Sequence, residues 1–483
     1  MLSLQKCLRN IVSQTTTMPS IRNNFLYKTL LTISSYIIGF ITFPYVSRVL
    51  GVDGIGAVNF ADNSVGYFIL FASMGIAILG TREIAATKDD QARRNRVFSN
   101  LLGLNIIFTT ITIIVYIGLI TLVPRFAQNA ELFYIGAAKI IATVFLVEWF
   151  FTGLEEFRYI TIRSIVIKLL YVVAVFTLIN DKSDYKLYFT LSVATVIINA
   201  LVNIIYARKF VRINRQALFS MRYLKEYVTL GLYSIMTSMY ITFNVMFLGL
   251  STDNTQVGYY TTAFKLYIIM LGIFSAFTSV TMPRISAMLA NGQHKDFTQI
   301  VAKSFDGIIK FILPMIICGV ILAPQIILVI SGEGFEGAVL PMRIIFPAAL
   351  AVGIAQVLAV QVLIPLKRDK VLLTASIIGA SASLLINILL VPHLQSVGSA
   401  IVTLAAESIV TLTYITYILR KRVIKLPFAS IGKNALHAIP PATVCLVCSY
   451  TIENPFICVA VAVVIGGGVW VVSNFKTLRE YLR

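Results

Sequence analysis

Long apolar blocks alternate with short polar gaps along this chain of 483 residues. Each block approaches or exceeds the ~20 residues that a helix needs to cross the hydrocarbon of a bilayer. A segment in hydrocarbon must satisfy its backbone N–H and C=O groups internally, so the blocks predict helices. The fourteen blocks lie near residues 26–47, 57–80, 98–123, 132–152, 160–179, 187–207, 227–250, 258–282, 304–330, 342–364, 371–391, 398–419, 434–451 and 456–473. The expected fold class is an all-α polytopic membrane protein with about fourteen transmembrane helices.

Basic residues decide the expected orientation. Thirty of the forty Lys and Arg residues fall in alternate gaps between the blocks. The opposite gaps hold four, namely Arg48, Arg125, Lys182 and Lys186. Basic loops stay on the cytoplasmic side, so both termini are predicted inside, which an even number of spans satisfies. The net charge of +19 is therefore a topology signal, and no basic domain stands apart to indicate nucleic-acid binding.

A weak internal repeat indicates two bundles. Shifting the sequence by 202 residues aligns Gly56 with Gly258 and Arg82 with Arg284. Six spans separate the copies, which predicts two six-helix lobes related by a parallel pseudo-two-fold repeat, plus two C-terminal helices. The predicted domains are a cytoplasmic tail (1–24), an N-lobe (25–207), an amphipathic cytoplasmic linker helix (208–226), a C-lobe (227–419), and spans thirteen and fourteen with a second cytoplasmic tail (420–483).

Polar stripes at helical spacing mark several spans. Tyr36 in span one, Asn63 in span two and Asn244 in span seven belong to such stripes. Lipid-facing surfaces need no polar residues, so the stripes face either a neighbouring helix or a water-filled cavity. Their recurrence in related spans favours a central substrate cavity, while helix packing remains open for each stripe taken alone.

Ionisable residues inside spans are a sharper signal, because each costs roughly 2.5–3.5 kcal/mol at mid-helix. Asp306 and Lys310 lie four residues apart and indicate a local ion pair. The remaining candidates are Lys139, Lys168, Lys265, Asp62 and Glu407. These candidates comprise three cations and two acids, so a cavity that they line would suit an anionic headgroup. Lys acts as a point charge toward phosphate. A structural ion pair remains open for each lysine. The two acids are candidates for ion coupling, and the thirty loop cations are assigned no substrate role.

Enzyme motifs are absent from the sequence. The chain has no G-x-x-x-x-G-K-[ST] motif for ATP phosphates, and its three His residues are scattered. We therefore expect no enzyme activity, no metal site and no cofactor. Net transport would draw on a proton or sodium gradient, or on removal of the product.

One motif-rich stretch, residues 43–85, points to a family. Arg48, Gly51, Gly56 and Arg82 carry its pattern, and Arg284 belongs to an echo in the second half. This stretch resembles the Wzx-type lipid-linked oligosaccharide flippases of the multidrug/oligosaccharidyl-lipid/polysaccharide exporter superfamily. The resemblance covers nearly the whole chain in span count and loop pattern.

The resemblance implies a multi-pass transporter of the bacterial cytoplasmic (inner) membrane. Its substrate would be a polyprenyl-pyrophosphate-linked oligosaccharide repeat unit for O-antigen, capsule or other surface polysaccharide, moved by alternating access of a basic central cavity. Membrane lipids and polysaccharide polymerase or assembly proteins are the expected partners. The alternatives are a multidrug or cation antiporter of the same superfamily, which should favour acidic cavity groups, and a membrane enzyme or scaffold of polysaccharide assembly.

Overall fold

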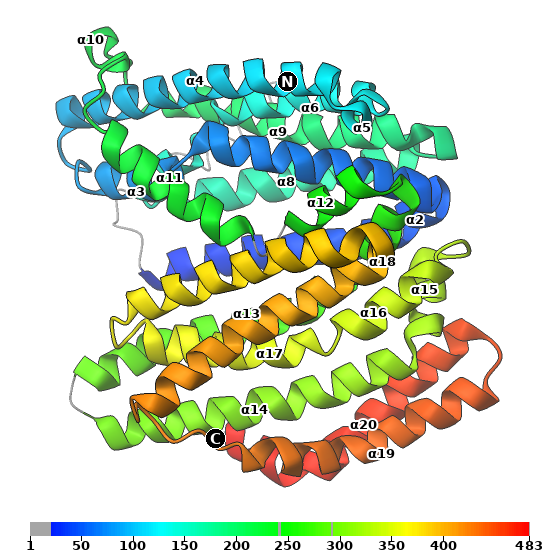
Figure 1. Ribbon diagram of the computed structural model, residues 1–483. Coiled ribbons are helices and arrows are strands. Elements are labelled where there is room, and N and C mark those ends of the chain that lie inside the picture. The colour runs from blue at the N-terminus through cyan, green and yellow to red at the C-terminus, as the bar shows by residue number, and fades with distance from the viewer. Residues whose placement is uncertain (1–20, 240–242, 291–292, 483) are drawn as a thin grey trace, which may run out of the picture.

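The computed structural model describes residues 21–239, 243–290 and 293–482, and these ranges contain helices but no β-strand (Figure 1). The first helices are α2 (Ile21–Ser73), α3 (Ile76–Ala85), α4 (Gln91–Leu122), α5 (Pro124–Ala127), α6 (Ala130–Thr143), α7 (Glu148–Gly153), α8 (Phe157–Leu178), η1 (Lys182–Asp184), α9 (Tyr185–Ala207) and α10 (Arg215–Leu218). The later helices are α11 (Leu224–Met239), α12 (Phe243–Ser251), α13 (Asn254–Ala290), α14 (His294–Ile321), α15 (Ala323–Ser331), η2 (Glu336–Ala338), α16 (Val339–Ile345), α17 (Ala348–Gln356), η3 (Val357–Leu363), α18 (Asp369–Arg420), α19 (Ala429–Thr451) and α20 (Pro455–Leu482). The all-α prediction is confirmed.

Each predicted apolar block coincides with a helix or with consecutive helices, as far as the described ranges reach. Within these ranges, eight helices are long and apolar enough to cross a membrane. A ninth is added if Glu336–Ile345 and Ala348–Leu363, bent by 40°, form one span. Helices α2 and α18 each carry two blocks across a backbone break, at Gly51 (φ 70°) and Gln395 (φ 50°). Glycine suits the first break because a positive φ costs it little.

The bundle has two distinct ends (Figure 1). The end at which α3 meets α4, α9 leads to α11 and α18 leads to α19 is called here the basic end, because its loops carry most of the Lys and Arg residues. The opposite end holds the breaks at Gly51 and Gln395 and the turn between α19 and α20. The two populations of loops that the sequence separates by charge therefore lie at different ends of the helices.

Helices α2 and α13 approach each other at backbone distance. A Cβ atom on Gly56 would lie 1.7 Å from the backbone oxygen of Asn254, and one on Gly258 would lie 2.3 Å from that of Val52. Only a residue without a Cβ atom permits this approach. The two glycines that the internal repeat aligns thus join the N-terminal helices to the C-terminal ones.

The stretch corresponding to predicted span seven forms two helices, and each contacts both the N-terminal and the C-terminal helices. Its first part, α11, packs against α2, α3 and α18, and its second part, α12, packs against α2, α13 and α18. The Gly75 N–H donates to the Tyr227 carbonyl at 3.2 Å, and the Asn105 amide donates to the Tyr227 hydroxyl at 3.2 Å. The N-terminal part of the predicted C-lobe is therefore attached to the N-terminal helices.

The predicted amphipathic helix over residues 208–226 is wrong. This segment contains a single helical turn, α10, before α11 begins. Side chains of α4 form hydrogen bonds with backbone N–H groups of this segment. Asn95 Oδ1 accepts from the Arg212 N–H at 2.9 Å, and Ser99 Oγ accepts from the Asn214 N–H at 2.7 Å. Such side-chain bonds to backbone compete with helix formation, and apolar spacing alone does not reveal them.

Substitution of Gly56 by Ala tests the contact between α2 and α13. The added methyl group collides with the Asn254 carbonyl. We therefore expect the free energy of unfolding to fall by about 1–3 kcal/mol, as for other overpacked sites. The measurement is the thermal unfolding midpoint of the detergent-solubilised protein, read by size-exclusion chromatography. Gly66→Ala in the same helix is the control, because its Cβ atom would meet open space. Equal midpoints for the two variants would contradict the proposed contact.

Candidate functional site

Three charged side chains gather where α2 packs near α6 and α13, and we call them the central cluster. The Lys139 ammonium lies 2.5 Å from the Asp62 carboxylate. The Lys265 ammonium lies 4.2 Å from the centre of the Phe43 ring, a distance suited to a cation–π interaction. Lys265 is also within electrostatic reach of Asp62. Two cations share one carboxylate, so the central cluster carries net positive charge.

Two tyrosines extend the central cluster toward α8 and α9. The Tyr171 and Tyr188 side chains interact with each other, and both lie within electrostatic reach of Asp62. Asn63, the predicted cavity residue beside Asp62, donates its amide to the Asn59 carbonyl of its own helix at 2.8 Å. The centre therefore offers ammonium and phenol donors from four helices to one region.

A row of polar side chains runs along α8 from the basic end. Arg163 donates to the Glu148 carboxylate at 2.8 Å and to Ser164 Oγ at 2.9 Å. The Lys168 ammonium donates to Ser35 Oγ on α2 at 2.5 Å. Ser164, Lys168 and Tyr171 follow at steps of four and three, so they share one helix face. This face leads from the basic end to the central cluster.

Arg163 corrects one expectation from the sequence. It was counted among the loop cations without a substrate role, yet it lies within α8 and only 6% of its surface is exposed. Its Nε and Nη1 atoms are buried and have no hydrogen-bond partner among the described residues. Because α8 already begins at Phe157, Arg163 is almost two turns inside the helix. The signal that could have revealed it is Glu148, an acid near the end of the preceding apolar block.

Asn244 lies apart from the central cluster. Its amide donates to Thr403 Oγ1 at 3.1 Å, its oxygen accepts from Asn387 at 2.7 Å, and the Tyr260 hydroxyl lies 2.8 Å from Thr403 Oγ1. These residues and Ser383 form a buried, uncharged network joining α12, α13 and α18. In this structure Asn244 holds helices together rather than lining a space with the lysines.

Glu407 is separated from Asp62 and has different surroundings. It lies on α18 within electrostatic reach of Tyr260 and Tyr267. Glu407 forms no ion pair with any residue in the described parts of the chain. The Tyr267 hydroxyl is buried and has no hydrogen-bond partner in the part of the chain that the structure describes. The two candidate acids therefore differ: Asp62 is paired with a lysine, and Glu407 faces phenol groups.

Two arginines connect the helices at the opposite end. The Arg48 guanidinium donates to the Val329 carbonyl, and its side chain packs against Gly332. Arg125, which the sequence counts among the four opposite cations but not among the candidate site residues, donates to the Gly249 carbonyl at 2.8 Å and to Asn254 Oδ1 at 2.9 Å. Both arginines belong to the N-terminal helices and reach across to C-terminal ones.

The remaining predicted residues have varied positions. Arg82 is exposed beside Glu83, at 3.1 Å. Lys310 and Asp306 form the predicted pair at 3.7 Å within α14. The side chains of Tyr36 and Arg284 lie outside the described residues, so the structure does not place them relative to the central cluster.

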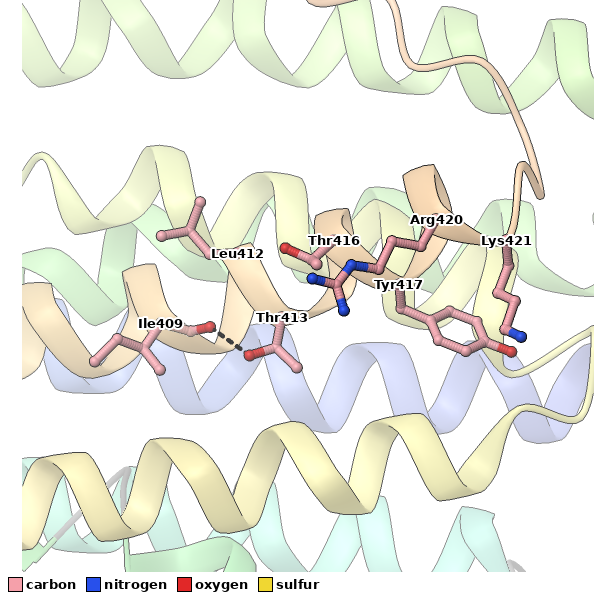
Figure 2. A pocket seen from close by; sticks show the side chains of 7 residues that line it. All are labelled: Ile409, Leu412, Thr413, Thr416, Tyr417, Arg420 and Lys421. Atoms are coloured by element: carbon pink, nitrogen blue, oxygen red, sulfur yellow. Dashed lines mark hydrogen bonds between the residues drawn. The ribbon is translucent and has the colours of Figure 1, made fainter.

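A groove of about 550 Å³ follows the last turns of α18 at the basic end. Figure 2 shows its lining, with Ile409 and Leu412 toward one end and Arg420 and Lys421 toward the other. None of the predicted site residues lines it. The groove is therefore separate from the central cluster.

The sequence of the chain matches a known family. Residues 21–289 match the family model described as polysaccharide biosynthesis protein. The chain belongs to this family. A protein of Escherichia coli (strain K12) named putative O-antigen transporter is 26% identical over 398 residues, covering 81% of this chain and 95% of that protein. A protein of the same name from Shigella dysenteriae is 25% identical over 410 residues, covering 81% of this chain and 98% of that protein.

Solved structures agree with the predicted fold. The lipid II flippase MurJ in an inward closed conformation superposes with a TM-score of 0.78 at 13% identity, covering 95% of this chain and 100% of MurJ. An inward-facing multidrug resistance MATE transporter gives 0.58 at 16% identity, covering 83% of this chain and 96% of the other. The predicted resemblance is confirmed, and so is the expectation of a multi-pass membrane transporter rather than an enzyme.

A double-mutant cycle on Asp62 and Lys139 tests the ion pair in the central cluster. Asp62→Asn leaves Lys139 unpaired, and we expect it to lower the free energy of unfolding by about 1–3 kcal/mol. That is less than for a fully buried pair, because 40% of the Asp62 side chain is exposed. Adding Lys139→Gln should recover part of this loss. Additive effects in thermal unfolding would show that the two side chains do not interact.

Proposed function

We propose that this protein moves a polyprenyl-pyrophosphate-linked oligosaccharide repeat unit across the cytoplasmic membrane for a surface polysaccharide. The observation that carries the proposal is the positive central cluster, which joins α2 and α6 to α13 in a chain of the polysaccharide biosynthesis family. The names of the two relatives, putative O-antigen transporter, support the same class of cargo.

The chemistry of the cargo explains why such a cluster is needed. A pyrophosphate-sugar headgroup loses its hydration in hydrocarbon, and without replacement hydrogen bonds the cost is prohibitive. Ammonium groups of Lys139 and Lys265 and the phenols of Tyr171 and Tyr188 supply such replacements. A lysine binds phosphate as a point charge and tolerates several headgroup orientations. The polyprenyl chain needs no such partners and stays in lipid.

The two ends of the bundle fit an alternating-access cycle. Basic loops remain in the cytoplasm, so the basic end and both termini face inward. The row formed by Arg163, Lys168 and Tyr171 then leads from the cytoplasmic side toward the central cluster. Arg48 and Arg125 hold the opposite end closed by bonds to Val329, Gly249 and Asn254. Their release would open the central cluster to the outer side.

A drug or cation antiporter is the second candidate, because MATE transporters share the fold. Such a transporter would need a carboxylate in the central cluster that is free to attract a cation. Asp62 is instead neutralised by Lys139 and has Lys265 nearby. The charge of the central cluster favours an anionic cargo.

Substitution of Lys265 or Lys168 by Ala tests the proposed role of the cations. We expect each variant to lower the amount of surface polysaccharide several-fold without lowering the amount of protein in the membrane, because a phosphate-binding charge is lost. Polysaccharide is measured by gel electrophoresis and protein by immunoblot. The matched control is Lys370→Ala, an exposed lysine at the basic end. Wild-type polysaccharide in both test variants would remove these lysines from the site.

Substitution of Glu407 by Gln tests coupling to protons. Glu407 has no cationic partner in the described ranges, so it can exchange a proton without breaking an ion pair, whereas Asp62 cannot. We expect Glu407→Gln to flatten the pH dependence of transport in reconstituted vesicles, while Asp62→Asn lowers the rate at every pH. Unchanged pH dependence in Glu407→Gln would exclude it as the coupling residue.

A further inference from the structure

The segment between α9 and α11 forms a surface of its own. Three large apolar side chains are exposed on it, Ile213 at 58%, Phe219 at 60% and Met221 at 54%. The same segment carries five cations and no acid over residues 208–222. The cations are Arg208, Lys209, Arg212, Arg215 and Arg222. We call these eight residues the linker patch.

Hydrogen bonds from α4 hold the linker patch in one conformation. Besides the bonds to Asn95 and Ser99 described above, the Asn100 amide donates to the Ala217 carbonyl at 3.1 Å and also to the Ser220 carbonyl. The Leu218 carbonyl approaches Gly103 so closely that a Cβ atom there would lie 1.5 Å away. The backbone of the segment is thus satisfied by one face of α4. The apolar side chains remain exposed although the backbone is well held.

The linker patch lies at the basic end of the bundle and also on its outer side. In Figure 1, α10 projects beyond α4 at the basic end, on the side away from the C-terminal helices. Residues 97–105 of α4 are buried, whereas Ile111 and Ile114 farther along the helix are exposed, as expected of a surface that faces lipid. The linker patch therefore lies where the lipid-facing surface of α4 meets the level of the headgroups.

The charges of the linker patch are available for a partner. None of its five cations forms an ion pair within the residues that the structure describes. Lys209 lies 4.9 Å from the centre of the Tyr206 ring, which leaves its charge uncompensated. Basic side chains beside exposed apolar ones are the combination that binds an anionic bilayer surface, where the apolar groups enter the acyl boundary and the cations meet the headgroups.

We propose that the linker patch binds anionic phospholipid headgroups of the leaflet at the basic end, with Ile213, Phe219 and Met221 inserted among the lipids. The inference rests on the membrane setting of the proposed function but not on its transported substrate. Because the segment connects the N-terminal helices to α11, the binding fixes this connection to the membrane surface.

The test places a tryptophan in the linker patch of the full-length protein by Phe219→Trp. The protein is reconstituted in vesicles of phosphatidylcholine with brominated acyl chains, with or without phosphatidylglycerol. The signal from position 219 is the difference from wild type, which has two Trp residues of its own. We expect brominated lipid to quench this signal, aqueous acrylamide to have little effect, and phosphatidylglycerol to increase the quenching in a manner that high salt reverses.

Charge variants separate lipid recognition from simple proximity. Arg212→Gln, Arg215→Gln and Arg222→Gln together should lower quenching in phosphatidylglycerol vesicles to the value in phosphatidylcholine alone. The control removes three cations from the basic end of the C-terminal helices and should leave quenching unchanged: Lys367→Gln, Lys370→Gln and Lys421→Gln. If Phe219→Trp does not fold, Met221→Trp replaces it as reporter.

Two outcomes would overturn the proposal. A residue-219 signal that acrylamide quenches and brominated lipid does not would place the linker patch in water or under a partner protein. Equal quenching with and without phosphatidylglycerol would show insertion without recognition of anionic headgroups. Neither readout requires transport, so failure here is distinct from failure of the proposed flippase function.

Discussion

The close contact between α2 and α13 is the constraint on which the site depends. Gly56 faces Asn254 while Gly258 faces Val52, so the two helices cross in a fixed register. Lys265 follows Gly258 by seven residues, about two helical turns or ~10 Å. That register places its ammonium over Phe43 and within reach of Asp62. A larger residue at either glycine would separate the helices and carry Lys265 away from the central cluster.

Much of this arrangement could be predicted from local sequence. The predictions that failed have a common cause, because each depended on contacts between residues far apart in the chain. Apolar block length predicted the helices, and the internal repeat aligned Gly56 with Gly258 without predicting that α2 and α13 approach each other there. The pair of Asp62 and Lys139 is separated by 77 residues, so the depth of each residue indicated a need for a partner without naming it. Asn244 shows the same limit, since a polar stripe in the sequence is the same whether it faces a cavity or four buried partners. The prediction of a linker helix over residues 208–226 failed because side chains of α4 bind the backbone of this segment, which the apolar spacing does not reveal.

Loop charge predicts topology well but does not describe individual residues. Arg163 satisfies the count for the basic end and yet lies inside α8, where the cost of burying a cation is offset by Glu148. The few cations at the opposite end also differ from one another in their contacts. Arg48 and Arg125 bind across the helices there, and Lys186 pairs with Glu131. Cations are scarce at that end, and three of the four have a structural partner.

The arginine bonds at the opposite end and the Lys139–Asp62 ion pair differ in which groups lose a partner when the contact breaks. Arg48 and Arg125 donate to neutral oxygen atoms, which water can satisfy when these bonds break, so on the proposed mechanism the opposite end can open and close reversibly. Separation of Lys139 from Asp62 instead leaves two charges without their present partners. On the proposed mechanism, an anionic headgroup that binds Lys139 must compete with Asp62 for the same ammonium. The carboxylate then keeps the site satisfied when it is empty, and Lys265, which has no direct carboxylate bond, offers the first charge to an arriving phosphate.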